Sequence, residues 1–354
     1  MAEPGPSRGV FVLAVNPCAG RGRALEDAHR AAELLRTGGD EAVVLSAADL
    51  GTLVGLVRDR LRAHALTTRA LVVVGGDGMV QAGLGVLAEL AAQGVDVPLG
   101  VVPCGTGNDL ARHLRVPLRD PVAAAGRILR RLDDPRDRRL DVGRVRFADG
   151  RTSCFATALC AGFDAVVNER ANRWLRPAGS SRYLLAVLVE IARLRTVHYR
   201  LEIEDAGGRR RTERRDGVLL NVANTSSIGG GLRIVPDARA DDGLLELFTV
   251  APLGRARFLL LFPRLFSGRH VALESVRIER VRAVAVDAPD VTVYADGERL
   301  GPLPVRVDVL PAAVRVLACF RNGFHRPEHV VVDRLEVRGP QRRPRRLPRS
   351  RAGA

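Results

Sequence analysis

The 354-residue sequence contains no lysine, so its basic side chains are arginine and seven histidines. This absence excludes every mechanism that needs a lysine ammonium group, including a Walker A phosphate site and a Schiff base. Any phosphate that the protein binds must therefore be met by arginine, a metal ion or backbone N–H groups. Aromatic residues make up only 4% of the chain, so its core must consist mainly of Val, Leu, Ile and Ala.

Paired cysteine motifs and long apolar runs are also absent. The five cysteines show no metal-ligand spacing, and the N-terminus, MAEPGPSRG, has no apolar secretory segment. These features predict a reduced, cytoplasmic protein. No charge-free run reaches the roughly 18 apolar residues that a membrane-spanning helix needs. YLLAVLVEIARL (183–194) and FLLLFPRLF (258–266) are shorter and carry Glu or Arg, which favours core-facing helices. Membrane contact is then expected to be peripheral, at the inner membrane face.

The formal net charge of +15 suggests an anionic partner, but this charge is unevenly distributed. Residues 338–354 are rich in Gly, Pro, Arg and Ser, contain no acid and contribute seven of the fifteen net positive charges. This composition predicts a basic, disordered tail that either touches an anionic surface or is solvated without a specific function. Because no aromatic residues that could stack on bases alternate with its arginines, nucleic acid is not favoured as a partner.

Apolar segments alternate with helical patterns in the first third of the chain. The runs GVFVLAV, EAVVLS, ALVVVGG and PLGVVPCG are each followed by glycine or polar residues and then by helical spacing of apolar residues. Strands that are apolar on both faces predict a parallel sheet covered by helices on both sides, with ligands at the carboxyl ends of the strands. From Arg138 onward, alternating strand-like segments predict a second, β-rich domain.

Three of the predicted strands end in glycine-rich turns, at Asn16–Gly22, Gly75–Gly78 and Pro103–Asp109. Glycine lets backbone N–H groups approach an oxygen ligand, and each turn leads into a helix whose N-terminus favours negative charge. Three such turns predict a phosphate-bearing ligand rather than simple tight turns. A conventional dinucleotide site is disfavoured because the first turn lacks G-x-G-x-x-G.

Asp77 is an acid inside the second of these turns. A carboxylate beside phosphates would repel them unless a divalent cation lies between, so Asp77 suggests Mg²⁺ or a proton to accept. The alternative is that Asp77 caps the helix that follows it.

The turns contain NP-x-x-G, GGDG and P-x-GTGND-x-AR, and the second half contains GFDAVVN, IVPDARADDGLLELFTV and YADGE. Together, from about residue 9 to 320, they resemble the diacylglycerol kinase catalytic family, which includes sphingosine, ceramide and bacterial lipid kinases. The resemblance implies an α/β nucleotide-binding domain, Rossmann-like, at residues 8–137 and a β-rich domain at residues 138–322, whose last strands return to the first domain. The active site would lie in the cleft between them, with ATP and Mg²⁺ as cofactors and a lipid alcohol as substrate, most simply diacylglycerol giving phosphatidic acid.

The resemblance also assigns the nucleotide contacts. Met79 replaces the threonine more usual after GGDG, and losing that hydroxyl contact would cost roughly 0.5–1.5 kcal/mol, which predicts weaker affinity rather than inactivity. Ser46 replaces a common threonine and keeps the hydroxyl. Arg21, Arg23 and Arg112 are either phosphate partners or solvated helix residues. The implied ATP contacts are Asn16, Gly20, Ser46, Gly75, Gly76, Asp77, Gly78, Met79, Val80, Gln81, Gly105, Thr106 and Asn108.

Acids from both domains are implied in catalysis and metal binding. Glu298 corresponds to the family's general base, acting with Asp77, although Asp296-Gly297 beside it is also a common hairpin turn. RADDGLL is similar to a structural magnesium loop. The implied ligands are the side chain of Asp242 and the carbonyls of Arg239 and Leu244, with Asp109 joining through water. The alternative is an Asp-Asp-Gly turn without a metal.

The sequence leaves two other functions open. One is an NAD kinase-like enzyme, which shares GGDG and Mg²⁺ but would not be expected to carry P-x-GTGND or the DGE segment. The other is a catalytically silent lipid- or nucleic-acid-binding protein, suggested by Met79 and the arginine-rich tail. The acceptor could be diacylglycerol, a sphingoid base, or a polyprenyl or glycolipid alcohol, and the oligomeric state is open, a homodimer included.

Overall fold

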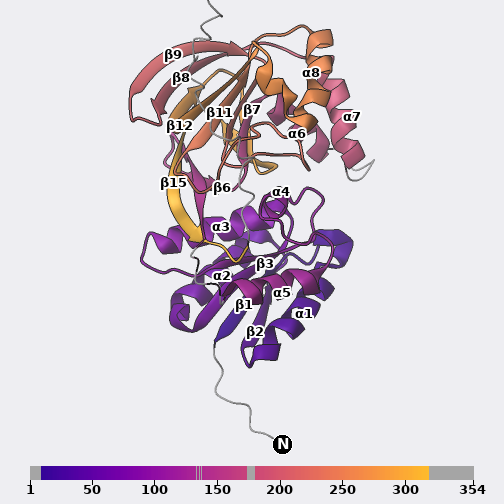
Figure 1. The fold of residues 1–354 in the computed structure, drawn as a ribbon, viewed down its shortest axis with the longest axis vertical. Helices are drawn as coiled ribbons and strands as arrows, with labels where there is room; N and C mark the ends of the chain where they lie inside the picture. Colours follow the sequence, from indigo (N-terminus) through magenta and orange to yellow (C-terminus); the bar gives the residue numbers. More distant parts are fainter. Residues whose placement is uncertain (1–8, 133, 135, 137, 174–179, 319–354) are drawn as a thin grey trace, which may run out of the picture. The chain divides into compact units, whose positions relative to one another are not determined.

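Two β-sheets organise the part of the chain that the computed structural model describes, residues 9–318 apart from 133, 135, 137 and 174–179. The predicted tail at 338–354 and Cys319 lie outside this part. The first sheet is parallel and has the strand order β2-β1-β3-β4 (Figure 1). Apart from the partly exposed edge strand β2, its strands are largely apolar and buried, as expected for a sheet covered on both faces. They are β1 (Val10–Val15), β2 (Glu41–Ser46), β3 (Thr68–Gly75) and β4 (Leu99–Pro103).

Helices cover this sheet in two packed pairs. One pair is α1 (Ala24–Leu35) and α5 (Pro121–Leu132), and the other is α2 (Leu50–Ala63) and α3 (Asp77–Ala91). Each helix buries an apolar stripe at helical spacing, as Leu53, Val57 and Leu61 do in α2. The predicted strands and helices of this region are therefore present. Shorter turns of helix are α4 (Asp109–His113), η1 (Ala19–Gly22), η2 (Arg36–Gly38) and η3 (Ala65–Thr67).

The second sheet has eleven strands, and every pairing in it is antiparallel. Apolar residues alternate with polar ones where one face meets solvent, as in β8. The parallel sheet and this β-rich second half confirm the predicted fold class. The strands are β5 (Arg139–Phe147), β6 (Thr152–Phe155), β7 (Ala158–Gly162), β8 (Val197–Asp205), β9 (Arg210–Gly217), β10 (Leu219–Ala223), β11 (Leu245–Val250), β12 (Val276–Asp287), β13 (Thr292–Ala295), β14 (Glu298–Pro302) and β15 (Val305–Arg315).

Three helices and the short turn η4 (Arg269–Ala272) accompany this sheet: α6 (Phe163–Arg173), α7 (Ser180–Ile191) and α8 (Arg255–Ser267). The two apolar segments predicted as core-facing helices form α7 and α8. Each buries one side, and α8 does so through Phe258, Leu261 and Leu265. Among the described residues, no helix combines the length and the apolar character needed to cross a bilayer.

The chain returns to the first sheet at the end of β15. Val316 forms a parallel bridge with Leu99 of β4, and its N–H donates to the carbonyl of Arg138. Val314, Val316 and Leu317 are buried in the same apolar core as β1 and β3. We call the parallel sheet with its helices the first lobe, and the antiparallel sheet with its helices the second lobe. The two lobes are thus joined by two chain passages.

Candidate active site

The three glycine turns lie next to one another. A Cβ atom on Gly76 would lie 3.1 Å from the Cα of Gly105, and one on Gly20 would lie 3.2 Å from the carbonyl oxygen of Cys104. The first two turns follow β1 and β3, which are neighbours from which the chain leaves toward opposite edges of the sheet. This is the switch point at which open α/β sheets bind their ligands. The sequence therefore brings backbone N–H groups of all three turns to the expected edge.

The third turn is held by its own polar side chains. Asn108 has a left-handed backbone (φ 53°), and its side chain accepts from the N–H of Gly105 at 3.0 Å and donates to the carbonyl of the same residue at 2.7 Å. Arg112 donates through Nε to the carbonyl of Gly107 at 2.9 Å. Asn108 and Arg112 thus fix the backbone that would face a phosphate.

Asp77 joins the second turn to the third. Its Oδ2 accepts from the N–H of Asn108 at 2.7 Å, and its Oδ1 accepts from the N–H of Asp109 at 2.6 Å. The helix that it begins, α3, has Gly76 as N-cap and no side-chain cap. The alternative that Asp77 caps its own helix is therefore wrong. Burial, together with the charge of Asp296, raises the pKa of Asp77 to about 6.

Asp109 joins the first lobe to the second. Its Oδ1 accepts from the N–H of Gly230 at 2.8 Å, and burial plus the charge of Asp77 raises its pKa to about 7. A Cβ on Gly107 would lie 2.6 Å from Oδ2 of Asp77 and 3.7 Å from Oδ2 of Asp109. Both carboxylates therefore border the space that the missing side chain of Gly107 leaves open.

Glu298 reaches the first lobe from a tight hairpin. β13 and β14 are joined by Asp296 (φ 49°) and Gly297 (φ 86°), the pair of positive φ angles typical of a type I′ turn. Glu298 opens β14, is exposed, and places Oε1 2.5 Å from the position of a Cβ on Gly78. The predicted hairpin turn is present, and it brings Glu298 to the GGDG turn. The turn and a functional role for Glu298 are therefore compatible.

Asp296 anchors this hairpin. Its carboxylate accepts from the N–H groups of Ala156 at 2.7 Å, Thr157 at 2.9 Å and Ala158 at 3.2 Å, and from the Thr157 hydroxyl. Burial raises the pKa of Asp296, while these donors favour its charged form. Glu298 therefore stands on a hairpin whose position is fixed by buried hydrogen bonds.

Gln81 is a second tie between the lobes. Its side-chain amide is buried and donates to the carbonyls of Cys154 at 3.0 Å and Ala295 at 3.4 Å. Met79 and Val80 are also buried, and Met79 lines an apolar space between α2 and β3. The Met79 side chain packs against the GGDG turn from within the core, where a Cβ on Gly75 would lie 2.6 Å from its Cβ. A nucleotide contact at residues 79–81 would have to come from backbone, so replacement of a threonine by Met79 removes no visible site group.

The remaining predicted nucleotide contacts lie at strand ends. Asn16 follows β1, and its Oδ1 accepts from the N–H of Cys18 at 3.0 Å. Ser46 is the exposed last residue of β2, and Thr106 is exposed in the third turn. Arg23 is exposed at the start of α1, whereas the side chain of Arg21 is outside the described part. Ser46 and Thr106 keep hydroxyl groups available to a ligand.

The RADDGLL loop is occupied by other contacts. Asp242 forms an ion pair with Arg280 and accepts from the N–H of Leu244 at 3.2 Å, and Arg239 pairs with Asp241. Within the described residues, no three His, Cys, Asp or Glu side chains are grouped so as to hold a metal ion. Because guanidinium already neutralises Asp242, this loop does not fit a magnesium ion well, and the predicted ligand set stays a prediction.

Some residues that shape the site were not predicted from the sequence. Asp141 is buried and accepts from the N–H groups of Gly243 and Ala312, each at 2.7 Å, which links β5 to two loops. The sequence predicts a turn at Asp296 and a nucleotide contact at Gln81, and neither prediction includes the contacts that these side chains make. The contact partner of Asp109 had a visible signal, because Gly229–Gly231 are three consecutive glycines and all adopt positive φ.

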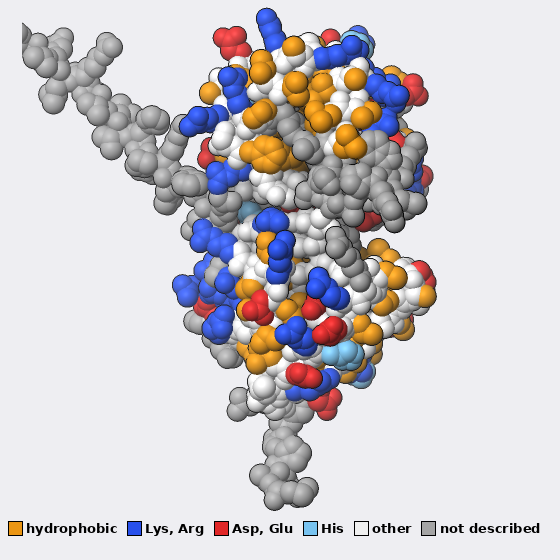
Figure 2. Space-filling view, turned by 90° about the vertical axis from the view of Figure 1, so that its right-hand side faces the viewer, with side chains coloured by type: hydrophobic (Ala, Val, Ile, Leu, Met, Phe, Trp, Pro, Cys, Tyr) orange, Lys and Arg blue, Asp and Glu red, His pale blue; other side chains and the backbone are white. Residues whose placement is uncertain are grey.

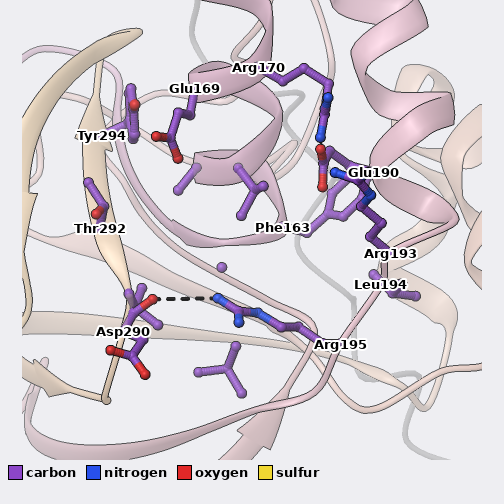
Figure 3. A pocket seen from close by; sticks show the side chains of 15 residues that line it. Phe163, Glu169, Arg170, Glu190, Arg193, Leu194, Arg195, Asp290, Thr292 and Tyr294 are labelled. Carbon is purple, nitrogen blue, oxygen red and sulfur yellow. Dashed lines mark hydrogen bonds and ion pairs between the residues drawn. The ribbon is translucent and has the colours of Figure 1, made fainter.

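A cavity of about 340 Å³ lies in the second lobe between α6, the end of α7 and β13 (Figure 3). Thr292 and Tyr294 face it from β13, the strand that leads to Glu298. Arg195 donates to the carbonyl of Asp290 at 3.5 Å along its wall. The lining is thus mixed in polarity and adjoins the hairpin of the candidate base.

Comparison with known proteins settles the family. The profile of the diacylglycerol kinase catalytic domain matches residues 10–145, and that of the YegS C-terminal NAD kinase beta sandwich-like domain matches residues 157–318. A Mycobacterium tuberculosis protein named "Diacylglycerol kinase" is 39% identical over 311 residues, covering 87% of this chain and 95% of that protein. The chain belongs to the diacylglycerol kinase catalytic domain family. It is therefore a diacylglycerol kinase-like enzyme, as the sequence motifs predicted.

Other relatives agree with this assignment. A Pseudomonas aeruginosa protein named "Probable lipid kinase YegS-like" is 30% identical over 294 residues, covering 82% of this chain and 89% of that protein. A crystal structure described as a diacylglycerol kinase from Bacillus anthracis has a TM-score of 0.63 at 17% identity, covering 88% of this chain and 97% of that one. At that identity the structural likeness shows the fold alone.

Proposed function

We propose that the protein transfers the γ-phosphoryl group of ATP to the hydroxyl group of diacylglycerol, giving ADP and phosphatidic acid. The observation that carries this proposal is the position of Glu298, whose carboxylate lies against Gly78 beside Asp77. A carboxylate from the second lobe thereby faces the turn that would hold the terminal phosphates.

The first lobe would bind ATP through backbone N–H groups of the three glycine turns and through the hydroxyls of Ser46 and Thr106. Phosphoryl transfer needs little covalent chemistry from the protein, so alignment and charge neutralisation supply most of the rate. Without lysine, the side-chain cations available are arginines, and Arg112 is already fixed on the third turn through Nε. Its remaining N–H groups are suited to a phosphate oxygen.

A magnesium ion would be held by Asp77 and Asp109. Their Oδ2 atoms border the same space over Gly107, and burial together with the charge of a neighbouring acid raises the pKa of both. Mg²⁺ is commonly held by one or two carboxylates, with water and substrate phosphate completing its shell. When bound, the ion would supply neutralisation of the phosphate charge.

Glu298 would act as the general base. Its carboxylate accepts the proton of the lipid hydroxyl as the hydroxyl oxygen bonds to the γ-phosphorus, and the bond from that phosphorus to the β–γ bridging oxygen breaks. ADP leaves with the electron pair of that bond. Because Glu298 is exposed in the protein alone, an entering lipid headgroup can reach it without a rearrangement of the core.

Diacylglycerol is the acceptor suggested by the names of the relatives, and the mixed cavity beside β13 offers space for its glycerol end. Such a substrate resides in a bilayer, so the proposal includes peripheral association with the inner membrane face. An NAD kinase-like activity is the second candidate, because the second matching profile carries that description.

An acceptor screen tests the proposal. The purified protein is incubated with γ-³²P-ATP and Mg²⁺ and offered, separately, diacylglycerol, a sphingoid base, a polyprenyl alcohol and NAD, and products are identified by mass spectrometry. We expect labelled phosphatidic acid, absent with Glu298→Gln. Labelling of NAD but no lipid would replace the proposal with the NAD kinase alternative, and nucleotide binding without any labelled acceptor would favour a silent binding protein.

A further inference from the structure

More than half of the large apolar side chains that are exposed in the described part lie on one side of the second lobe. Of the eleven large hydrophobic residues exposed in the described part, six lie on α7, α8 and η4, which are short, adjoining elements. Figure 2 shows hydrophobic side chains gathered on this lobe with arginines around them. The six are Leu185 (43% exposed), Leu188 (50%), Leu259 (47%), Leu260 (69%), Phe266 (57%) and Val271 (43%). We call them the α7–α8 face.

Helix α8 has the construction of a helix that lies on an interface. Phe258, Leu261 and Leu265 hold it to the lobe, so its outward leucines, Leu259 and Leu260, are not needed for packing. An exposed apolar face this rich is unusual on a soluble protein unless something covers it. A second apolar layer on the outside of an already packed helix therefore indicates a docking surface.

The charges on α8 and η4 are of one sign. Between Ala251 and Leu273 the chain has four arginines and no acid. All four, Arg255, Arg257, Arg264 and Arg269, are exposed, and none forms an ion pair with a carboxylate in the described part of the chain. In contrast, the arginines of β9 and β12 are extensively paired with glutamates, as Arg215 is with Glu213 and Glu279. The α7–α8 face thus combines exposed leucines with arginines that no carboxylate of the described part neutralises.

We propose that the α7–α8 face docks on an anionic lipid bilayer, with its leucines entering the headgroup–acyl boundary and its arginines meeting lipid phosphates. Apolar side chains flanked by arginine match this partner, since each basic group near an anionic surface strengthens binding about fivefold. This inference rests on the proposed function. It also explains how a chain without a spanning helix among its described residues could reach a bilayer-resident acceptor, because the cavity beside β13 is lined by the end of α7.

Vesicle flotation of the full chain without ATP tests the docking face. Vesicles of phosphatidylcholine alone are compared with vesicles that contain about 30 mol% phosphatidylglycerol and therefore carry a negative surface charge. We expect binding to the anionic vesicles only, weakened about tenfold by Leu260→Glu and about fivefold for each of Arg257→Gln and Arg264→Gln. Leu66→Glu is the matched control, since Leu66 is a fully exposed leucine of the first lobe.

Several outcomes separate this inference from its alternatives. Unchanged vesicle binding by Leu260→Glu would overturn it. A change in oligomeric state with Leu260→Glu, measured by sedimentation, without a change in vesicle binding would assign the face to a second copy of this chain and also overturn it. Phosphorylation of diacylglycerol in detergent micelles reports on the proposed function alone. We expect Leu260→Glu to keep that micellar activity, which also shows that the variant folds.

Discussion

The two lobes bring their groups to the site by different means. The first lobe contributes backbone N–H groups. Its glycines let three turns meet so closely that a Cβ at Gly105 would overlap the Cα of Gly76. The second lobe contributes a side chain, Glu298, which is positioned by a hairpin that Asp296 anchors. Under the proposed function, phosphate binding and proton transfer would have separate structural supports, which single substitutions can break one at a time.

The largest effect on stability and ATP binding is expected when the close contact between the glycine turns of the first lobe is disrupted. Gly105→Ala would force its Cβ into Gly76 and to within 2.8 Å of the Asn108 side chain, so the second and third turns must separate. We expect a loss of about 3 kcal/mol in unfolding free energy and at least tenfold weaker ATP binding, measured by urea unfolding and calorimetry. Gly85→Ala is the control. Gly85 lies in α3 with no atom near its missing Cβ, and this change should stabilise the protein by about 0.5–1 kcal/mol.

Disrupting the anchor of the β13–β14 hairpin should leave nucleotide binding almost unchanged. Asp296→Ala leaves the N–H groups of Ala156, Thr157 and Ala158 without their carboxylate. We expect about 2–3 kcal/mol of destabilisation and a strong fall in kcat, with ATP affinity changed less than threefold. Asp287→Ala, an exposed acid of the same lobe, should change neither. A large loss of ATP affinity in Asp296→Ala would show that the two supports are not separate.

The buried acid Asp164 sharpens the contrast between structural and site carboxylates. Burial raises its pKa to about 6, against the opposing hydrogen bond from Asn221 at 2.8 Å. A folded-state pKa above the unfolded value makes the folded protein bind more protons, so this contribution to stability is full at low pH and falls as the pH rises from about 4 through 6. Relative to wild type, Asp164→Asn should gain about 2 kcal/mol between pH 4 and 7.5 in urea unfolding. An identical pH dependence in both proteins would contradict this.

The smallest effect is expected at the tie between the lobes. Gln81→Met keeps the side-chain volume but removes the hydrogen bonds to Cys154 and Ala295. We expect roughly 1 kcal/mol less stability and a several-fold lower kcat at unchanged KM for ATP, because Asp77 and Glu298 lose part of their alignment. Gln93→Met, at an exposed position near the end of α3, is the control. Equal kinetics in the two variants would show that Gln81 does not contribute to the alignment of Asp77 and Glu298.

The sequence predicts the first lobe well because the patterns that specify its strands and turns lie within short stretches of chain. Apolar runs and glycine turns at Asn16–Gly22, Gly75–Gly78 and Pro103–Asp109 follow from periodicity and turn chemistry alone, and the structure has them at the predicted strand ends. The family resemblance added Glu298, which composition would have left as a turn residue. Both depend on short stretches of chain that carry their own signal.

The rest depends on contacts between residues far apart in the chain. That Gln81 would bond to Ala295, or Asp77 to the N–H of Asp109, follows from how the strands meet and has no local sequence signal. Likewise, the position of Met79 directly after GGDG predicts a site residue, but its side chain is buried in the core. The ion pair of Asp242 with Arg280 joins a loop to a strand that its motif does not include.

The convergence of the two lobes on one phosphate is tested most directly by single-turnover phosphoryl transfer with Glu298→Gln. Arg299→Gln, the next residue of the same hairpin, is the control. With diacylglycerol in micelles and ATP bound in advance, the account predicts a rate about 10³-fold lower for Glu298→Gln, with ATP affinity and thermal stability unchanged. A transfer rate within threefold of wild type would contradict it, because the carboxylate beside Gly78 would then take no part in the reaction.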